Sequence, residues 1–280
     1  MCRLLEVSRS GYYEWLSRPP RAQAQAQVDQ EVQAKVQHYF AQGRGTYGTR
    51  RIKYLLAQEG LQVSRRRIGR VLNQAGLRCK TRRKYKAPTT AGQAQTAAPN
   101  QLNRELTVPV PDKAYVGDST YLPTGEGWLY LAVVLELGSR AVVGWSMADH
   151  MRAALVNQAL AMAICQRRPV AGLIMHTDRG AQYGADSYRP LLTQHGIEPS
   201  MSRKGNWWDH AVAESFCHPL KTALVYLEDF DTHEQAQTAV FAYIEVCYNR
   251  QRCHSANGYL APLAYEQVRK TNEILCPEKC

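Results

Sequence analysis

The sequence predicts two parts with different folds: an all-α helix-turn-helix region, followed by an α/β core with a mixed five-stranded sheet and flanking helices. Charge marks the division, because residues 1–104 carry 20 Lys and Arg against 5 Asp and Glu, whereas residues 105–280 carry 15 against 19. The hydrophobic pattern changes at the same place, from helical spacing to short apolar runs typical of strands. This split is typical of a basic part that binds a polyanion, joined to a near-neutral part with a different task.

The composition is that of a globular protein without a membrane segment. Of the 280 residues, 45% are hydrophobic, and the formal net charge is +11. No apolar run approaches the roughly 18 residues of a membrane-spanning helix. The first residues also lack the apolar stretch and cleavage site of a secretory signal. We therefore expect a cytoplasmic protein with no membrane partner.

Eight cysteines are scattered along the chain. The chain length and the missing signal do not fit a small secreted domain held by disulfides. A zinc site is the alternative, but the C-terminal spacings, C-x5-C-H and C-x3-C, are unlike the usual zinc motifs. We favour free thiols over a zinc site built from Cys247, Cys253, His254, Cys276 and Cys280.

The N-terminal region is expected to be helical throughout. Residues 1–22 suggest two short helices around "VSRSG" that end at Pro19-Pro20, which we interpret as a truncated helix-turn-helix-like segment. After it, an apolar stripe at a spacing of four residues predicts a helix over residues 23–41. The stripe consists of Val28, Val32 and Val36.

Residues 23–86 form the predicted basic helix-turn-helix domain. Two short apolar helix faces are separated by Gly60, and Ser64 is a suitable N-cap for the second helix. From Ser64 to Lys86 there are ten Lys and Arg and no acid. A solvated basic surface is the alternative, but the adjoining helix pattern favours DNA binding through phosphate contacts. The predicted DNA-contacting residues of the second helix are Arg65, Arg66, Arg67 and Arg70.

A small, polar, unpatterned stretch predicts a linker over residues 87–108. The core is expected over residues 109–275, with C-terminal helices. Three strand patterns follow one another in "AYVGDSTYL", "GWLYLAVVLEL" and "RAVVGWSM". Alternating helices and strands follow, which predicts a mixed sheet rather than a barrel. These later elements are a helix at 152–166, a strand at 171–177, a helix at 187–195, a strand in "IEPSMS", and helices at 209–225 and 232–248.

Three acids occupy separate elements of this core. Asp118 is on the first strand, and Asp178 is at the tip of the fourth. Glu214 follows on a helix, with 35 residues between it and Asp178. Alone, an Asp such as Asp178 commonly caps the turn after a strand. Three convergent carboxylates would repel one another unless hard divalent cations lay between them. Two Mg²⁺ or Mn²⁺ ions about 4 Å apart would suit phosphodiester chemistry.

Several segments together resemble the orfB-type transposases of the insertion sequence three family. They are "YGTRRI", "VGDSTYLPTGEGWLYLAVVLELGSRAVVGWSM", "HTDRGAQY", "SMSRKGNWWDHAVAESF" and "YNRQRCHSANGYLAP". The resemblance covers nearly the whole chain and includes the pattern D, then D-x35-E, with a Lys seven residues after the Glu. It implies an RNase H-like fold of the retroviral-integrase superfamily with a DDE active site.

The resemblance also implies roles for particular residues. Asp118, Asp178 and Glu214 would be catalytic and would bind two Mg²⁺ or Mn²⁺ ions. His176 and Asp209 would support them, although a packed core histidine is an equal alternative for His176. Further DNA contacts would come from Arg179, Gln182, Arg203, Lys204, Asn206 and Lys221.

The implied activity is metal-dependent cleavage and strand transfer at the ends of an insertion sequence. The resemblance further implies terminal inverted repeats and target DNA as partners, a homo-oligomer on DNA, and an upstream-frame protein as fusion or partner. Such a protein would be bacterial and associated with the nucleoid when bound to DNA.

The sequence departs from the family pattern at Tyr115, Glu136, Gly138, His210 and Pro219. A weakened copy that only binds DNA as a regulator or inhibitor is therefore the alternative. Pro219 in particular is expected to kink its helix and turn Lys221 away from the metal-binding face.

Overall fold

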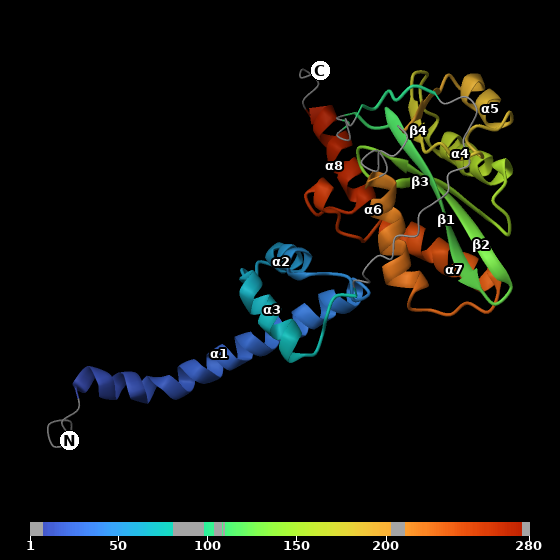
Figure 1. Ribbon diagram of the computed structural model, residues 1–280. Coiled ribbons are helices and arrows are strands. Elements are labelled where there is room, and N and C mark those ends of the chain that lie inside the picture. The colour runs from blue at the N-terminus through green and yellow to red at the C-terminus, as the bar shows by residue number, and fades with distance from the viewer. Residues whose placement is uncertain (1–7, 81–97, 104–107, 109, 203–210, 276–280) are drawn as a thin grey trace. The chain divides into compact units, whose positions relative to one another are not determined.

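The computed structural model describes residues 8–80, 98–103, 108, 110–202 and 211–275. The chain divides into two compact units, residues 1–80 and 81–280. The first unit is helical, and the second contains a sheet with helices on both of its faces (Figure 1).

The first unit consists of α1 (Arg9–Gln42), α2 (Thr49–Gln58) and α3 (Arg65–Gln74). The expected helix end at Pro19-Pro20 is wrong, because α1 continues through both prolines. The φ angle of proline, about −65°, is compatible with a helix. Each proline therefore costs only a lost hydrogen bond and a ring clash, together about 3 kcal/mol. The surrounding Gln- and Ala-rich run favours helix. The predicted boundary between residues 22 and 23 therefore lies inside one helix.

The helical core of this unit forms where α2 and α3 pack against the second half of α1. Val32 and Val36 are buried, but Val28 of the expected stripe is 46% exposed. The N-cap predicted at Ser64 is confirmed, since its hydroxyl accepts a hydrogen bond from the Arg67 backbone N–H at 3.3 Å. The inward-facing residues of α2 and α3 are Ile52, Leu56, Ile68 and Leu72.

The second unit is built on a five-stranded mixed sheet, as the sequence predicts. The strand order is β3-β2-β1-β4-β5. β1 pairs with β2, and β2 with β3, in antiparallel fashion, whereas β4 is parallel to both β1 and β5. The strands are β1 (Ala114–Thr124), β2 (Gly127–Glu136), β3 (Val142–Ala148), β4 (Ile174–Thr177) and β5 (Glu198–Met201).

Helices cover the two faces of the sheet (Figure 1). Alternate side chains of β2 point to opposite faces, so Ala132 and Val134 join one hydrophobic cluster while Leu131 and Val133 join another. The first cluster packs against α4 (Ala153–Arg167) and α5 (Tyr188–Gln194). The second packs against α6 (Ala211–Leu220), the π-helical turn η2 (Lys221–Val225), α7 (His233–Ala242) and the π-helical turn η3 (Tyr243–Tyr248).

A buried polar network fixes the last helix, α8 (Pro262–Leu275), which follows the short 3₁₀ turn η4 (Ser255–Asn257). The Arg167 guanidinium donates to both Glu266 oxygens, at 2.9 and 2.8 Å. The Ser139 hydroxyl donates to the same carboxylate at 2.7 Å. Because Arg167 ends α4 and Ser139 lies in the β2–β3 turn, Glu266 ties three segments together.

The end of the expected linker packs on the sheet. Residues 81–97 lie outside the described residues, but Leu102 is 7% exposed and belongs to a cluster with Ala114 and Val116 of β1. The Gln101 backbone N–H donates to the Ser200 hydroxyl at 2.9 Å. Residues 98–103 are therefore part of this unit, since one buried leucine is enough to anchor them.

Three departures from the family pattern have a structural account. The Glu136 carboxylate is fully buried and accepts hydrogen bonds from the Gly138 and Ser139 backbone N–H groups, which closes the β2–β3 turn. A Cβ at Gly138 would approach the Val108 carbonyl to 3.0 Å, so a bulky residue does not fit there. The buried Tyr115 ring places its hydroxyl 2.6 Å from the Asp112 carboxylate, to which it donates.

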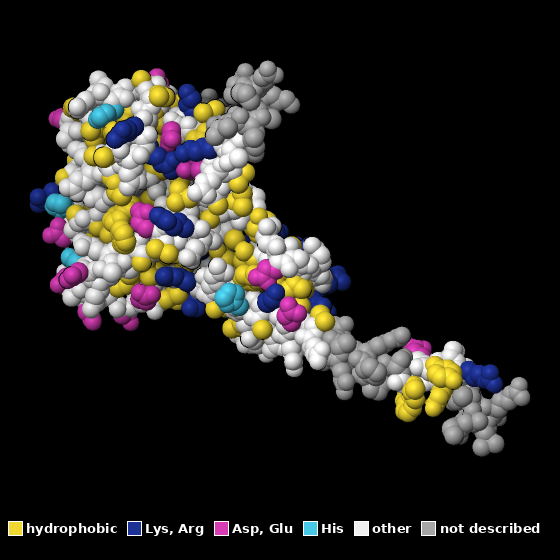
Figure 2. Space-filling view, turned by 180° about the vertical axis from the view of Figure 1, so that it is seen from behind, with side chains coloured by type: hydrophobic (Ala, Val, Ile, Leu, Met, Phe, Trp, Pro, Cys, Tyr) yellow, Lys and Arg dark blue, Asp and Glu magenta, His cyan; other side chains and the backbone are white. Residues whose placement is uncertain are grey.

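The surface of the second unit carries charges of both signs. On the face shown in Figure 2, Lys and Arg side chains are interspersed with Asp and Glu. Within the described part of the chain, no helix is both long and apolar enough to cross a bilayer. The described cysteines, Cys79, Cys165, Cys217, Cys247 and Cys253, are free thiols.

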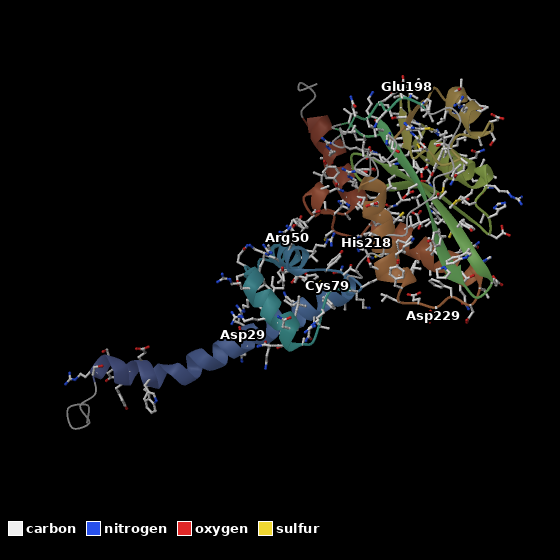
Figure 3. All side chains as sticks on the ribbon, viewed as in Figure 1. Asp29, Arg50, Cys79, Glu198, His218 and Asp229 are labelled. Atoms are coloured by element: carbon white, nitrogen blue, oxygen red, sulfur yellow. The ribbon has the colours of Figure 1, made fainter. Side chains whose placement is uncertain are left out.

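We expect Glu136→Ala to lower the free energy of unfolding by about 2 kcal/mol or more, because it leaves two turn N–H groups without their acceptor. Glu136→Gln, which keeps one acceptor oxygen, should cost less. Urea unfolding followed by circular dichroism measures both. The matched control is Glu198→Ala, at the exposed glutamate labelled in Figure 3. If Glu136→Ala were as stable as this control, the carboxylate would not hold the turn.

Candidate active site

Asp118 and Asp178 lie at the same level of two neighbouring parallel strands. β1 and β4 pair with Val116 opposite His176, and an aspartate follows two residues later in each segment. Adjacent strands are about 4.8 Å apart, so this register brings the two carboxylates together. Both aspartates are half-buried, whereas Val116 and His176 are fully buried.

The local backbone orients both carboxylates. Asp118 Oδ1 accepts a hydrogen bond from the Ser119 backbone N–H at 2.8 Å. Asp178 Oδ1 accepts one from the Gly180 backbone N–H, also at 2.8 Å. Asp178 therefore does cap the turn after its strand, as the alternative interpretation expected. Only one of its two oxygens, Oδ1, takes part in this cap. The hydrogen bond from Gly180 orients the Asp178 carboxylate and does not involve Oδ2.

Helix α6 contacts Asp118 through a cysteine that the sequence did not single out. The Cys217 thiol lies 3.5 Å from Asp118 Oδ2 and can donate to it. Burial raises the pKa of this thiol well above its usual value, and the negative charge of Asp118 adds to the shift. The charges of Lys221 and Glu214 also act on Cys217, in opposite directions. Glu214, Cys217 and Lys221 therefore follow one another along α6 and the start of η2.

Glu214 lies in the first turn of α6, three residues before Cys217, and its side chain is exposed. Residues 203–210, which lead into this helix, lie outside the described residues. Within the described ranges, no three His, Cys, Asp or Glu side chains come together closely enough to hold a metal ion. Asp118 and Asp178 thus each lie two residues beyond a paired position of β1 and β4, and Glu214 is on the adjoining helix.

A buried tyrosine, Tyr183, lies close to both aspartates and was not predicted from the sequence. Burial raises the pKa of its phenol well above the usual value, and the charges of Asp118 and Asp178 raise it further. Tyr183 therefore stays protonated beside the two carboxylates. Side chains fill the space over Gly117, because a Cβ there would lie 2.6 Å from the Met175 methyl carbon and 3.6 Å from the Tyr183 ring. The one feature of the sequence that could have indicated Tyr183 is its place at the end of the segment "HTDRGAQY".

Lys221 remains on the side of α6 that contains Cys217. Its Nζ lies 4.8 Å from the ring centre of Tyr121, three residues after Asp118 on β1. Lys221 therefore lies beside β1, and the expectation that Pro219 turns it away from the metal-binding face stays a prediction. The helix passes Pro219 and then widens into η2, where the Tyr226 N–H bonds the Lys221 carbonyl at 2.9 Å.

The other residues that the sequence predicted to support the site or to contact DNA lie in or near β4 and the loop that follows it, or outside the described residues. His176 is fully buried, and its Nδ1 lies 2.9 Å from the Ser200 hydroxyl on β5, as for a packed core histidine. Arg179 donates from Nε to the Ser202 carbonyl at 2.8 Å, which braces the loop after β4. Gln182 is half-buried in the same loop. Arg203, Lys204, Asn206, Asp209 and His210 lie outside the described residues.

In the first unit, three of the four predicted arginines of α3 are exposed. Arg65, Arg66 and Arg70 face solvent, whereas Arg67 forms an ion pair with Asp29 of α1. One arginine of the basic run is therefore paired with an acid, and this acid lies on another helix and far away in the sequence.

Comparison with known proteins places this geometry in a family. A model described as HTH-like domain matches residues 27–85, and models described as integrase core domain match residues 109–207 and 214–269. The chain is similar to the catalytic core domain of BIV integrase at 20% identity, over 57% of this chain and 98% of that one, with a TM-score of 0.44.

Two relatives match nearly end to end. The Insertion element IS600 uncharacterized 31 kDa protein of Shigella sonnei is 41% identical over 267 residues, which is 95% of this chain and 97% of that protein. Transposase InsF for insertion sequence IS3A of Escherichia coli (strain K12) is 40% identical over 266 residues, 95% of this chain and 92% of that protein. The chain therefore belongs to the IS3 family of transposases, which carry an integrase core and an HTH-like domain.

Proposed function

We propose that this transposase cleaves and joins DNA strands at the ends of an insertion sequence through Asp118, Asp178 and Glu214. One observation carries the proposal: the parallel register of β1 and β4 aligns the first two carboxylates. Active sites in α/β sheets commonly lie at the carboxyl ends of parallel strands, and Asp178 follows the carboxyl end of β4. Glu214 would complete the set from α6.

The donor set fits hard divalent cations. Carboxylate oxygens are the ligands that Mg²⁺ and Mn²⁺ prefer, and each aspartate has its Oδ1 oriented by a backbone N–H. The chemistry that two such ions would supply is activation of the attacking oxygen and stabilisation of the leaving oxygen of a phosphodiester. Asp118, Asp178 and Glu214 would hold them.

The protein's own side chains would prepare the site. The oriented carboxylates lower the cost of assembling a charged centre, because their positions are set before DNA binds. Tyr183 excludes water from beneath the two aspartates. Lys221 would bind a phosphate of the DNA end, and Tyr121 below its ammonium group holds it in place through a cation–π contact. His176 would act only indirectly, by fixing β4 against β5.

DNA would be bound by both units. In the first, Arg65, Arg66 and Arg70 of α3 are exposed and can contact phosphates or base edges, as a recognition helix does. In the second, Arg179 and Gln182 lie in the loop that follows Asp178. Arg203, Lys204 and Asn206 remain proposed DNA contacts, and Asp209 a supporting residue, from the sequence alone.

Assembly on DNA is a further part of the proposal. Two element ends must be processed together, which suits a homo-oligomer. An upstream-frame protein, fused or separate, would add to end recognition. Strand-joining assays on element-end DNA, with the protein fused or not fused to its upstream frame, test this role. Equal joining activity of the two proteins would show that the upstream frame is not needed.

The alternative of a DNA-binding regulator without catalysis is not favoured. The departures at Tyr115, Glu136 and Gly138 are accommodated by the fold. None of them alters the proposed carboxylates.

We expect Asp118→Asn, Asp178→Asn and Glu214→Gln each to abolish strand cleavage and joining, because each removes a charge needed to bind a cation while preserving shape. Binding to element-end DNA should stay nearly unchanged. Gel assays of nicked and joined strands in Mg²⁺ or Mn²⁺ measure the first, and filter binding measures the second. Asp229→Asn and Glu228→Gln, at exposed positions, are the matched controls. More than a few percent of activity in one variant would exclude that residue as a ligand.

Within α3, we expect glutamine at Arg65, Arg66 or Arg70 to weaken DNA binding more than Arg67→Gln. The reason is that Arg67 is already paired with Asp29. Each lost phosphate contact should reduce the slope of log K against log salt concentration by about 1. Fluorescence anisotropy of the full chain on DNA at several salt concentrations measures this slope. An equal or larger effect of Arg67→Gln would show that the ion pair opens on binding.

A further inference from the structure

β1 and β2 extend beyond β4 as a two-stranded hairpin (Figure 1). The pairing of β1 with β4 ends at Val116, whereas its pairing with β2 continues to Thr124. Among the described residues, the second half of β1 therefore has a neighbouring strand on one side only. Asp118 lies at the start of this open edge, where a DNA strand can approach it.

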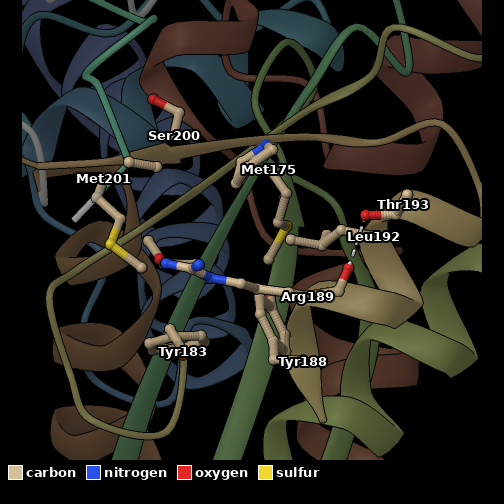
Figure 4. A pocket seen from close by; sticks show the side chains of 11 residues that line it. Met175, Tyr183, Tyr188, Arg189, Leu192, Thr193, Ser200 and Met201 are labelled. Carbon is tan, nitrogen blue, oxygen red and sulfur yellow. Dashed lines mark hydrogen bonds between the residues drawn. The ribbon is translucent and has the colours of Figure 1, made fainter. Parts of the chain in front are cut away.

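On the other side of β1, β4, β5 and α5 surround a small cavity of about 250 Å³. Its lining is mainly apolar, with Met175, Leu192 and Met201 among the side chains (Figure 4). The two aromatic rings of this lining, Tyr183 and Tyr188, are only 3% and 2% exposed. They are therefore not available to a DNA base at the surface.

Two aromatic rings of the hairpin, by contrast, are each about half exposed. Tyr121 of β1 is 50% exposed, and Trp128 of β2 is 52% exposed. Their ring centres are 5.0 Å apart, and their planes are nearly perpendicular, at 84°. Within the described part of the second unit, no other pair of touching rings has both members exposed to this extent. Exposed aromatic side chains are the surfaces on which unpaired bases stack.

A cation lies beside this aromatic pair. Lys221 Nζ is 4.8 Å from the centre of the Tyr121 ring, although η2 packs on the face of the sheet to which Asp118 points. The open edge of β1 lets the lysine reach round to this ring. The acid of the hairpin turn, Glu126, is already engaged, because its carboxylate accepts a hydrogen bond from the His233 backbone N–H at 2.6 Å. The aromatic pair therefore has a cation next to it that can bind a phosphate.

We propose that Tyr121 and Trp128 bind an unpaired base of the element end, while Lys221 binds a phosphate of the same nucleotide. A strand rises about 3.3 Å per residue, so Tyr121 lies about 10 Å along β1 from Asp118. This distance equals about three nucleotides of a duplex strand, at 3.4 Å each. The proposal rests on the proposed function, because the base is counted from the phosphate at Asp118.

The geometry of β1 explains why the base would be unpaired. Asp118 and Tyr121 are three residues apart, so their side chains point to opposite faces of the strand. A DNA strand with a phosphate at Asp118 and a base on Tyr121 would therefore cross the open edge of the sheet. A base that is still stacked and paired in a duplex cannot separate from its neighbours in this way.

The test compares a blunt element-end duplex with duplexes that carry three unpaired nucleotides on one strand or the other. Full-length protein is used in EDTA, so that no cleavage takes place. The first unit meets the same duplex in each case, so the ratio of the dissociation constants reports the unpaired bases. We expect one of the overhang duplexes to bind about tenfold more tightly than the blunt one. Fluorescence anisotropy measures this preference.

The variants separate the rings from the rest of the surface. Trp128→Leu and Tyr121→Leu keep apolar bulk but remove a ring, so each should reduce the preference to about twofold or less. Tyr121→Phe should retain it. The matched control is Phe241→Leu, at an exposed ring of α7, which should also retain it. 2-Aminopurine among the three unpaired bases gives a local readout, because its fluorescence falls when it stacks on an indole.

Thermal unfolding shows which variants are folded. The proposal is overturned if blunt and overhang duplexes bind equally, or if folded Trp128→Leu keeps both the tenfold preference and the quenching. It is also overturned if Phe241→Leu loses the preference to the same extent, or if sedimentation shows that Trp128→Leu changes only the number of chains in the complex. Asp118→Asn should keep the overhang preference, and cleavage by that variant would contradict only the proposed function.

Discussion

The parallel pairing of β1 with β4 is the constraint on which the proposed catalytic arrangement depends. Val116 opposite His176 puts Asp118 level with Asp178, and a slip of one residue would turn one of the two side chains to the other face of the sheet. The antiparallel pairing of β1 with β2, which extends from Tyr115 to Thr124, holds β1 in place. Apolar side chains on both faces of β2 secure that register by burial.

The two faces of the sheet make different contributions near the aspartates. On one face, α6 brings Cys217 to the Asp118 carboxylate and has Glu214 one turn earlier. On the other, Tyr183 belongs to the cluster that packs beneath α4 and α5. A change on either face can therefore reach the carboxylates through a single side chain.

Local patterns in the sequence predicted much of this structure. Strand alternation and apolar runs identified all five strands, and Ser64 marked the start of α3. The sequence did not predict contacts between residues that are far apart in the chain, or helices that continue through a proline. Nothing near Arg67 indicates its pairing with Asp29, and nothing near Cys217 indicates its contact with Asp118, because each partner comes from another element. Pro19 and Pro20 were interpreted as a helix end and Pro219 as a kink, although helices α1 and α6 both continue through their prolines.

Cleavage of the protein chain by bound iron tests the alignment most directly. Fe²⁺ in place of Mg²⁺, with ascorbate and peroxide, generates radicals that cut the backbone next to the metal. The account predicts cuts close to both Asp118 and Asp178, suppressed by excess Mg²⁺ and lost together in either Asn variant. Cuts near only one of the two aspartates, or cuts that Mg²⁺ does not suppress, would contradict a shared metal site.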